Sequence, residues 1–188
     1  MRVAQLQVTD AQSYRRLMLE GYAHDADAYT STVEERAAQP LAWWEKRIED
    51  SAGLTAAFGA FGGGTLIGSV ALEFSAKAKI RHKAFLIGMY VSHRHRNIGA
   101  GRALLRAAIA HAAAHSGLRA IMLTVTEGNA AAIELYRSSG FSEFGNEPMA
   151  ILTPSGYKAK VHMWLPLAAE ARIADHAGAA VSSLNGGS

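Results

Sequence analysis

Residues 93–102, with the sequence HRHRNIGAGR, combine the residue types that bind an anion. The segment follows an apolar run at 84–91 and opens a stretch with helical spacing, so we predict a turn between a strand and a helix. Backbone N–H groups at a helix N-terminus have no acceptor within the helix, and Gly99 and Gly101 let a ligand approach the main chain closely. The segment therefore predicts a phosphate-binding turn with arginine side chains nearby.

Two common nucleotide-binding motifs do not fit this turn. A dinucleotide-binding turn would follow the first strand and carry a third glycine where this chain has Leu104. A P-loop would need a Gly-Lys-Ser/Thr sequence, which is absent. The chain has no cysteine and its histidines show no metal-ligand spacing, so we expect no metal site, no disulfide and no cysteine nucleophile.

A second block, at 129–141, has the sequence NAAAIELYRSSGF and the pattern of a short helix. Asn129 is a residue type that caps helix N-termini, and Gly140 is one that ends helices. On such a helix Tyr136 shares a face with the small residues Ala132 and Gly140, which leaves room beside it for a ligand. From residue types alone, Tyr136 can also be a core aromatic residue and Asn129 only a cap.

Together the two blocks resemble the GNAT superfamily of N-acetyltransferases, whose members share a turn R/Q-x-x-G-x-G/A and a later motif N-x-x-A-x-x-L-Y-x-x-x-G-F. Here the turn is RNIGAG at 96–101, and the later motif begins at Asn129. The resemblance covers about 3–167, and the sequences RHKA and GMYV near the two ends of the apolar run are similar to those of a bacterial subgroup. His93 departs from the family pattern, which often has proline there.

The resemblance implies an enzyme that uses acetyl-CoA as cosubstrate and transfers the acetyl group directly to a primary amine of a small molecule. It implies that Asn129 and Tyr136 lie beside the thioester and that Ala132 is a further cofactor contact. A phenol has a pKa near ~10 and a thiol near ~8.5, so Tyr136 could donate a hydrogen bond or a proton to the departing sulfur. The other implied contacts are to the pantetheine arm from Met89, Tyr90 and Val91, and to the pyrophosphate from the N–H groups of Arg96, Asn97, Ile98, Gly99, Ala100, Gly101 and Arg102.

The reaction also needs a group that takes a proton from the attacking amine. Glu73 is the leading candidate because it is the one acid in the apolar run at 65–74. Its alternative role is that of an outward, solvated residue on a half-exposed strand. His82, His93 and His95 are further candidates.

The acceptor is expected to enter beside the segment at 20–35 and the loop at 146–156. An acidic lining there would suit a cationic amine. A protein N-terminus or a lysine is the alternative acceptor, and a non-catalytic acyl-CoA-binding sensor is the alternative from another functional class. The side chains predicted to shape the acceptor pocket are Tyr22, Tyr29, Glu34 and Glu147.

These residues are positioned by a predicted α/β fold with a mixed, mostly antiparallel sheet of about six or seven strands flanked by helices, in the order β-α-α-β-β-β-α-β-α-β-β. The run 84–91 lacks polar alternation and is predicted to be the central strand, buried on both faces. It should be parallel to the strand at 120–125 through a right-handed crossover. Other strands are predicted at 3–8, 54–61, 65–74, 141–144 and 157–167. Helices are predicted at about 10–20, 101–116 and 129–139, and two more helices should start near residues 32 and 40.

The composition is that of a soluble globular protein, with 188 residues, of which 49% are hydrophobic and 19% charged. The net charge of +3 is too small to predict a nucleic-acid partner. No apolar run reaches the ~18 residues of a membrane span, and the lack of cysteine favours a reducing cytoplasm. We expect one acetyltransferase domain at 1–167 and a flexible Ala/Gly/Ser-rich tail at 168–188. Members of the superfamily are often dimers, so a homodimer is a further expectation.

Overall fold

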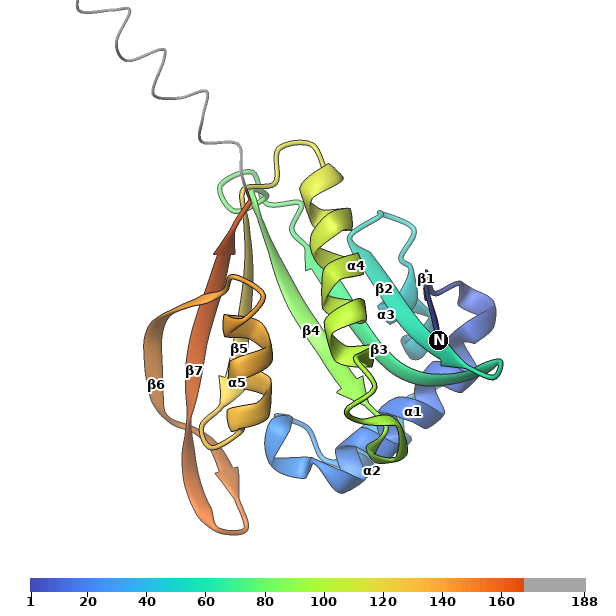
Figure 1. The fold of residues 1–188 in the computed structure, drawn as a ribbon, viewed down its shortest axis with the longest axis horizontal. Coiled ribbons are helices and arrows are strands. Elements are labelled where there is room, and N and C mark those ends of the chain that lie inside the picture. The colour runs from blue at the N-terminus through green and yellow to red at the C-terminus, as the bar shows by residue number, and fades with distance from the viewer. Residues whose placement is uncertain (168–188) are drawn as a thin grey trace, which may run out of the picture.

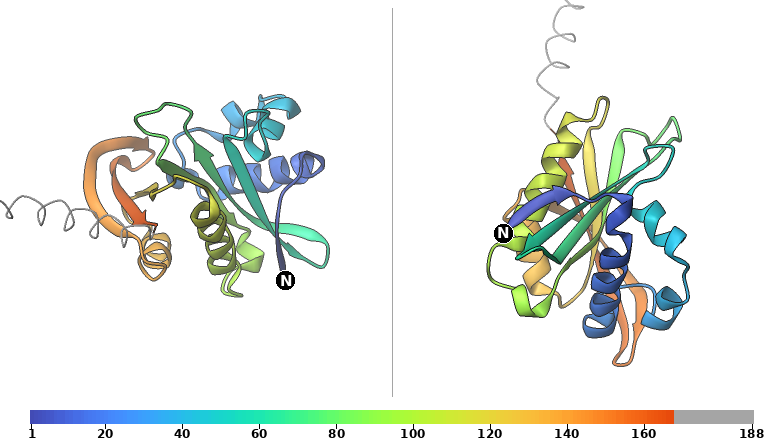
Figure 2. Two further views of the ribbon diagram at one scale, coloured as in Figure 1. Left: turned by 90° about the horizontal axis from the view of Figure 1, so that it is seen from above. Right: turned by 90° about the vertical axis from the view of Figure 1, so that its right-hand side faces the viewer.

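The computed structural model describes residues 1–167, which form a seven-stranded sheet with helices on both faces (Figure 1). Helices α4 (Ala100–Ala114) and α5 (Ala130–Arg137) cover one face, and α1 (Ala11–His24) and α3 (Leu41–Ile48) cover the other (Figure 2). The predicted fold class is confirmed. The remaining elements are β1 (Arg2–Gln5), η1 (Val8–Asp10), η2 (Ala26–Ala28), α2 (Val33–Ala37), β2 (Thr55–Gly62), β3 (Thr65–Phe74), β4 (Lys83–Val91), η3 (His93–His95), β5 (Ala120–Thr126), β6 (Ser142–Thr153) and β7 (Gly156–Pro166).

The strand order is β1-β2-β3-β4-β5-β7-β6, and only the β4–β5 pair is parallel among the described strands. The register of that pair runs only from Lys83 to Phe85 in β4 and from Ala120 to Met122 in β5. Beyond these residues the two strands diverge and divide the sheet into two halves (Figure 1). The divergence leaves the second half of β4 without a neighbouring strand on one side.

Strand β4 also carries a bulge at the point where it diverges from β5. Ser69 of β3 pairs with Tyr90 and Ala71 pairs with Ile87, so one residue of β3 lies opposite two residues of β4. Gly88 takes a φ of 60°, a left-handed conformation that glycine adopts without steric cost. The Ser69 hydroxyl donates a hydrogen bond of 3.1 Å to the Gly88 carbonyl, which fixes the backbone direction at the bulge.

Each face of the sheet has its own hydrophobic core. Beneath α4 and α5, buried residues such as Leu104, Leu105 and Ile121 form one cluster. Beneath α1 and α3, Tyr14, Trp44 and other residues form the second. The two clusters hold the helices in place on the two faces of the sheet.

Three predicted boundaries are wrong. Strand β6 runs from Ser142 to Thr153, where a four-residue strand and a loop were expected. It is an edge strand whose residues are nearly all exposed, so it lacks the apolar alternation that reveals a half-buried strand. An edge strand also tolerates Pro148, which lies at a register shift between Glu147 and Ile151.

Helix α1 continues to His24, four residues past the predicted end near residue 20. Gly21 suggests a helix end in the sequence, but here it lets Tyr29 and Tyr90 pack closely against the helix. A Cβ at this position would lie 3.0 Å from the Tyr29 hydroxyl and 3.0 Å from the Tyr90 ring. The first strand is likewise shorter than predicted, because residues 8–10 form a turn of 3-10 helix.

Strand β4 is the central strand, as predicted, but it is not buried on both faces. Phe85 is exposed, and Ile87, Gly88 and Met89 are only partly buried. Where β5 diverges, this part of β4 borders cavities. An apolar run can therefore line a ligand site as well as fill a core.

The predicted tail at 168–188 lies outside the described residues. Within residues 1–167 no helix has the length and apolar character needed to cross a membrane. No group of three or more metal-binding side chains occurs in the same part of the chain.

Candidate active site

The turn before α4 has the backbone of an anion site. Asn97 and Gly99 have φ values of 63° and 81°, and α4 begins at Ala100. The N–H groups of the first helical turn have no acceptor within the helix. A Cβ at Gly99 would meet no atom within 4 Å, so the space above the turn is open. The predicted phosphate ligands 96–102 therefore form one open turn at a helix N-terminus.

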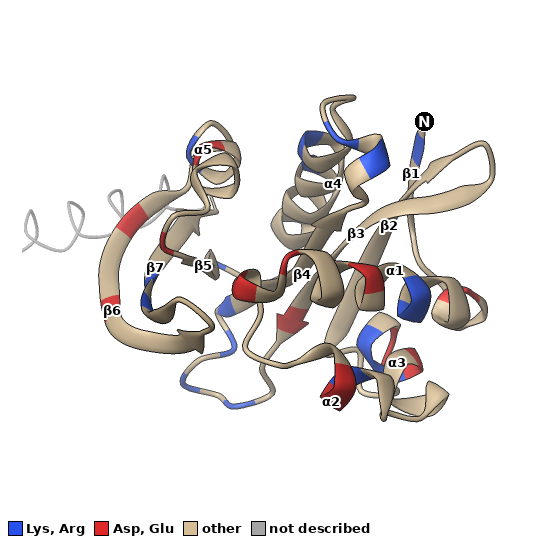
Figure 3. Ribbon diagram, turned by 90° about the horizontal axis from the view of Figure 1, so that it is seen from below, with Lys and Arg blue, Asp and Glu red and all other residues tan. Residues whose placement is uncertain are grey.

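The side chain of Arg96 pairs with a carboxylate from the segment that follows α1. Its guanidinium forms an ion pair with Asp25 and donates a hydrogen bond of 3.3 Å to the Val91 carbonyl. His93 is 3.0 Å from the same carboxylate. The acidic segment that contains Asp25 follows α1 and lies between the ends of α1 and β7, near the centre of the view in Figure 3. The side chain of Arg96 thus connects the turn to η2, and its backbone remains at the turn.

A cavity of about 710 Å³ lies beside this turn, and we call it the donor cavity. It is bounded by the end of β4, the N-terminal ends of α4 and α5, and η2. Lys158 of β7 closes one side through an ion pair with Asp27. The predicted cofactor contacts that line it are Met89, Tyr90, Val91, Arg96, Gly101, Asn129 and Ala132.

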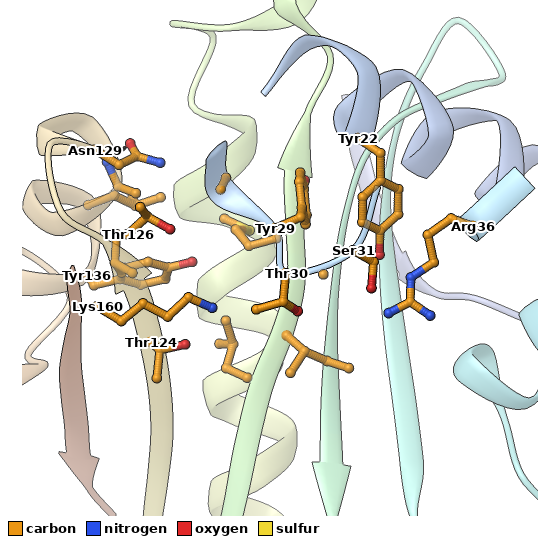
Figure 4. Close-up of a pocket in the computed structure, with 18 of the residues that line it drawn as sticks. Tyr22, Tyr29, Thr30, Ser31, Arg36, Thr124, Thr126, Asn129, Tyr136 and Lys160 are labelled. Atoms are coloured by element: carbon orange, nitrogen blue, oxygen red, sulfur yellow. Dashed lines mark hydrogen bonds between the residues drawn. The ribbon is translucent and has the colours of Figure 1, made fainter. Parts of the chain in front are cut away.

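A second cavity of about 290 Å³ lies between β4 and β5 where they diverge, and we call it the acceptor cavity (Figure 4). Leu86 to Met89 form one wall, and Thr124 to Thr126 form the opposite wall. The two cavities adjoin, because both are lined by Ala28, Tyr29, Met89, Thr126, Asn129, Ala132 and Leu135.

Tyr136 lies on the wall of the acceptor cavity next to this shared boundary. Its ring is 6% exposed and packs against Phe141 with 5.7 Å between ring centroids. Its hydroxyl points into the cavity (Figure 4). Burial raises the pKa of Tyr136 well above its usual value, so the phenol stays protonated at neutral pH. It can donate a hydrogen bond into the cavity.

Asn129 and Thr126 lie at the boundary itself. Asn129 caps α5, because its side-chain oxygen accepts a hydrogen bond of 3.2 Å from the Ala132 N–H. Its amide NH₂ group is not used in that cap. The Thr126 hydroxyl is buried and has no partner among the described residues. Both groups are therefore available to a ligand that spans the two cavities.

Lys160 of β7 is a cavity residue that the sequence did not single out. Its side chain extends into the acceptor cavity on the same side as Tyr136 (Figure 4). Burial lowers the pKa of Lys160, and the charge of Glu147 opposes this shift only in part. Lys160 has no ion-pair partner within 4.0 Å in the part of the chain described. The alternation of β7 offered a weak sequence signal for its direction but none for its role.

The opposite side of the acceptor cavity carries Arg36 and Arg47, which sequence reasoning also missed. Tyr22 lines the cavity between them and the shared boundary (Figure 4). Arg36 lies in α2, whose N-terminus is held by a capping box of Thr32 and Glu35. The described lining contains no Asp or Glu, so the expected acidic lining is wrong.

Of the predicted acceptor contacts, Tyr29 lines both cavities. Burial raises the pKa of its phenol, which therefore stays neutral. Glu147 is exposed on β6 and lies 3.0 Å from His162, outside both cavity linings. Glu34 is also exposed and lies in neither lining.

The candidate proton acceptors from the sequence lie outside the acceptor cavity. Glu73 is half exposed at the end of β3, with its carboxylate 3.7 Å from Arg47. His93 and His95 belong to η3 and line a separate pocket together with residues of α1. His82 lies in the connection before β4. Glu73 approaches the cavity lining through its contact with Arg47.

Comparisons with known proteins agree with this geometry. A family model described as the Acetyltransferase (GNAT) family matches residues 18–141, which include both sequence blocks. No curated protein matches the chain significantly.

Solved structures share the fold at low identity. A ribosomal-protein-alanine N-acetyltransferase from Brucella melitensis is 23% identical, covers 89% of this chain and 100% of its own, and has a TM-score of 0.73. YncA from Salmonella typhimurium, solved with its cofactor acetyl-CoA, is 22% identical, with coverage of 89% and 94% and a TM-score of 0.74. A phosphinothricin acetyltransferase from Sinorhizobium meliloti in complex with acetyl-CoA is 20% identical, with coverage of 88% and 88% and a TM-score of 0.77. Because the family model covers most of the chain, the protein belongs to the GNAT family of acetyltransferases, and the predicted enzyme class and acetyl-CoA cosubstrate are confirmed.

Proposed function

We propose that the enzyme transfers an acetyl group from acetyl-CoA directly to the primary amine of a small molecule. The observation that carries this proposal is the pair of adjoining cavities, with Tyr136 and Lys160 directed into the smaller one beside their common boundary (Figure 4). When bound, acetyl-CoA supplies the thioester carbonyl that the amine attacks. A cavity of about 290 Å³ suits a small acceptor.

The donor cavity fits the cosubstrate through main-chain groups. The N–H groups of residues 99–102 would hold the pyrophosphate, since they lie at the open N-terminus of α4. The backbone of 89–91, which lacks a neighbouring strand on one side, would pair with the pantetheine arm. The buried hydroxyl of Thr126 and the amide of Asn129 offer further donors at the boundary.

Two groups would stabilise charge during transfer. A backbone N–H near Tyr90, next to the bulge at Gly88, would donate to the oxyanion that forms on the carbonyl. Tyr136 would donate a hydrogen bond to the departing sulfur. Because burial raises the phenol pKa far above that of a thiol, Tyr136 stabilises the thiolate and keeps its own proton.

Lys160 is the better placed of the two proton-acceptor candidates. The N–C bond would form first and give the oxyanion, and the C–S bond would then break. The proton of the amine would pass to the acceptor group, and the sulfur would leave as a thiolate that takes a proton from solvent. Lys160 lies on the wall of the acceptor cavity, and its lowered pKa favours the neutral amine that can accept a proton. Glu73 lies outside the cavity beside Arg47, where it would act only through an intervening water.

A protein N-terminus or lysine is the alternative acceptor, and the Brucella structure named above is a ribosomal-protein-alanine acetyltransferase. The acceptor cavity has a volume of only about 290 Å³ and carries Arg36 and Arg47 at its far end, which favours a small molecule over a polypeptide. A non-catalytic acyl-CoA sensor would keep the donor cavity but would not need Lys160 and Tyr136 directed into a second cavity.

A cytoplasmic homodimer is the assembly we propose. Exposed apolar side chains gather on the outer β6–β7 hairpin, which is the edge of the sheet. Light scattering coupled to gel filtration should give twice the mass of the chain, and a monomer at micromolar concentration would contradict the proposal. The exposed residues are Phe144, Met149, Leu152, Tyr157 and Trp164.

Release of free thiol tests the proposed activity. The protein is incubated with acetyl-CoA and a panel of small primary amines, and acetylated product is identified by mass. Transfer to at least one small amine, strongly reduced in Tyr136→Phe, is expected. Transfer only to peptides would favour the protein acceptor, and CoA binding without transfer to any amine or peptide would favour the sensor.

A further inference from the structure

We propose that the acceptor amine also carries a carboxylate, which binds to Arg36 and Arg47 at the end of the acceptor cavity opposite Tyr136. This inference rests on the proposed function and specifies the class of its substrate, an amino-carboxylic acid. It starts from the charges of the lining. Arg36, Arg47 and Lys160 line the cavity, and no Asp or Glu does so among residues 1–167. An amine with no anionic group would meet only positive or neutral side chains.

Arg36 is a guanidinium without an anionic partner in the described chain. Its Nε atom is buried and makes no hydrogen bond. No carboxylate among residues 1–167 lies within 4.0 Å of it. Its position is fixed by aromatic rings, with the guanidinium carbon 5.7 Å from the Tyr22 ring centroid and 4.6 Å from that of Trp43. A partly buried cation with an unused donor is costly unless a ligand supplies the acceptor.

Arg47 brings a second guanidinium to the same place. Its carbon lies 4.8 Å from the centroid of the same Trp43 ring. Its side chain is only 21% exposed, and Glu73 approaches to 3.7 Å, which is too long for a hydrogen bond. Two guanidinium groups, each with five N–H donors, are therefore held against the indole ring of Trp43. The planar arrangement of these donors matches the two oxygens of a carboxylate.

The two ends of the cavity are suited to the two ends of one molecule. Tyr136 and Lys160 point in from one side, next to the boundary with the donor cavity, and Arg36 points in from the other (Figure 4). An amino acid bound with its carboxylate at Arg36 and Arg47 would direct its amine toward the thioester. Burial lowers the pKa of Lys160, so its side chain would repel a cationic amine less than a fully protonated lysine does.

Matched acceptors test this inference in wild-type enzyme. Each amino acid of a standard set is compared with its own carboxamide and with the amine that lacks the carboxyl group, by thiol release from acetyl-CoA. For the best acceptor we expect kcat/KM at least tenfold higher for the acid than for either analogue. Equal or better rates with the carboxamides would overturn the inference and leave the proposed transfer to amines intact.

Arginine variants distinguish a lost contact with the carboxylate from a general loss of activity. Arg36→Gln and Arg47→Gln should each raise KM for the acid at least tenfold and change KM for the carboxamide less than twofold. Arg81→Gln, at an exposed arginine outside both cavities, is the matched control. If both cavity variants affected acid and carboxamide equally, the carboxylate contact would be ruled out.

Equilibrium binding keeps the test independent of turnover. N-acetyl amino acids and N-acetyl amino acid amides are titrated into the protein with CoA present, and tryptophan fluorescence is followed because Trp43 touches both guanidinium groups. Acids should bind at least tenfold more tightly than amides, and Arg36→Gln should remove the difference. Equal affinity in wild type would overturn the inference. An absence of thiol release with every amine would instead contradict the proposed function.

Discussion

In our assignment the donor cavity would hold its ligand mainly through backbone groups, whereas the acceptor cavity would use side chains from separate parts of the chain. The residues proposed for these backbone contacts, 89–91 and the turn at 96–102, lie close together in the sequence, and Met89, Tyr90, Val91, Arg96 and Gly101 line the donor cavity. The acceptor side combines Arg36 from α2, Arg47 from α3 and Lys160 from β7. A contiguous backbone site leaves a sequence motif, and a site assembled from distant side chains does not. The four predictions below test this difference between the two cavities.

Gly99→Trp should have the largest effect. An indole above the open turn would block the N–H groups of residues 99–102, and we expect the CoA dissociation constant to rise by at least ~100-fold, or about 2.7 kcal/mol. Isothermal titration with CoA measures this. Gly117→Trp is the control, because Gly117 has a φ of 83° and open space around it but lies outside both cavities. If both variants bound CoA with the affinity of wild type, the turn would not be the pyrophosphate site.

Lys160→Met should lower kcat/KM by about 100-fold at pH 7, the low end of the range for a lost general base. Lys160 has a pKa below 10.5, and only its neutral form accepts a proton, so wild-type kcat/KM should rise with pH as the lysine is deprotonated. In the variant the rise should move to higher pH, where the acceptor amine itself is neutral. Lys77→Met, at an exposed lysine, is the control. An unshifted pH profile would remove Lys160 from proton transfer.

Tyr136→Phe should lower kcat by about 30-fold, since a hydrogen bond to a charged group contributes roughly 1.5–3 kcal/mol. CoA affinity should stay within about twofold of wild type, because the ring and its contact with Phe141 are kept. Single-turnover rates and CoA titration measure the two effects separately. Tyr157→Phe, at an exposed tyrosine outside both cavities, should behave as wild type. A full rate in Tyr136→Phe would make Tyr136 a core residue.

Glu73→Gln should have the smallest effect. The carboxylate is half exposed and outside both cavities, so we expect kcat to fall less than about threefold at every pH. Steady-state rates with a good acceptor measure the fall in kcat. Glu49→Gln, at another surface acid, is the control. A fall of tenfold or more, with loss of the dependence on pH, would return Glu73 to the role of proton acceptor in place of Lys160.

Most of the fold could be predicted because its elements leave local signals. The apolar runs of β2, β3 and β5 and the amphipathic pattern of α4 gave boundaries within two residues. The errors occur where such signals fail. Strand β6 is an exposed edge strand with Pro148 in it, and α1 continues through Gly21, where Tyr29 and Tyr90 lie close to the glycine.

The candidate site was predictable on the donor side for the same reason. Gly99, Asn129 and Tyr136 lie in two short blocks with fixed spacing, and the structure brings both blocks to one pair of cavities. The acceptor side depends on the divergence of β4 from β5 and on packing against Trp43, which no local pattern encodes. Arg36 and Lys160 therefore looked like ordinary surface cations in the sequence.

Backbone amide shifts during a CoA titration test the central claim most directly. In ¹H–¹⁵N spectra of the isotope-labelled protein, the largest changes should occur at the amides of Gly99, Ala100, Gly101 and Arg102, with smaller ones at 89–91. The hairpin turn between β2 and β3, at 62–64, should not change because it lies outside both cavities. Saturable CoA binding that left residues 99–102 unshifted would contradict the assignment of the donor cavity.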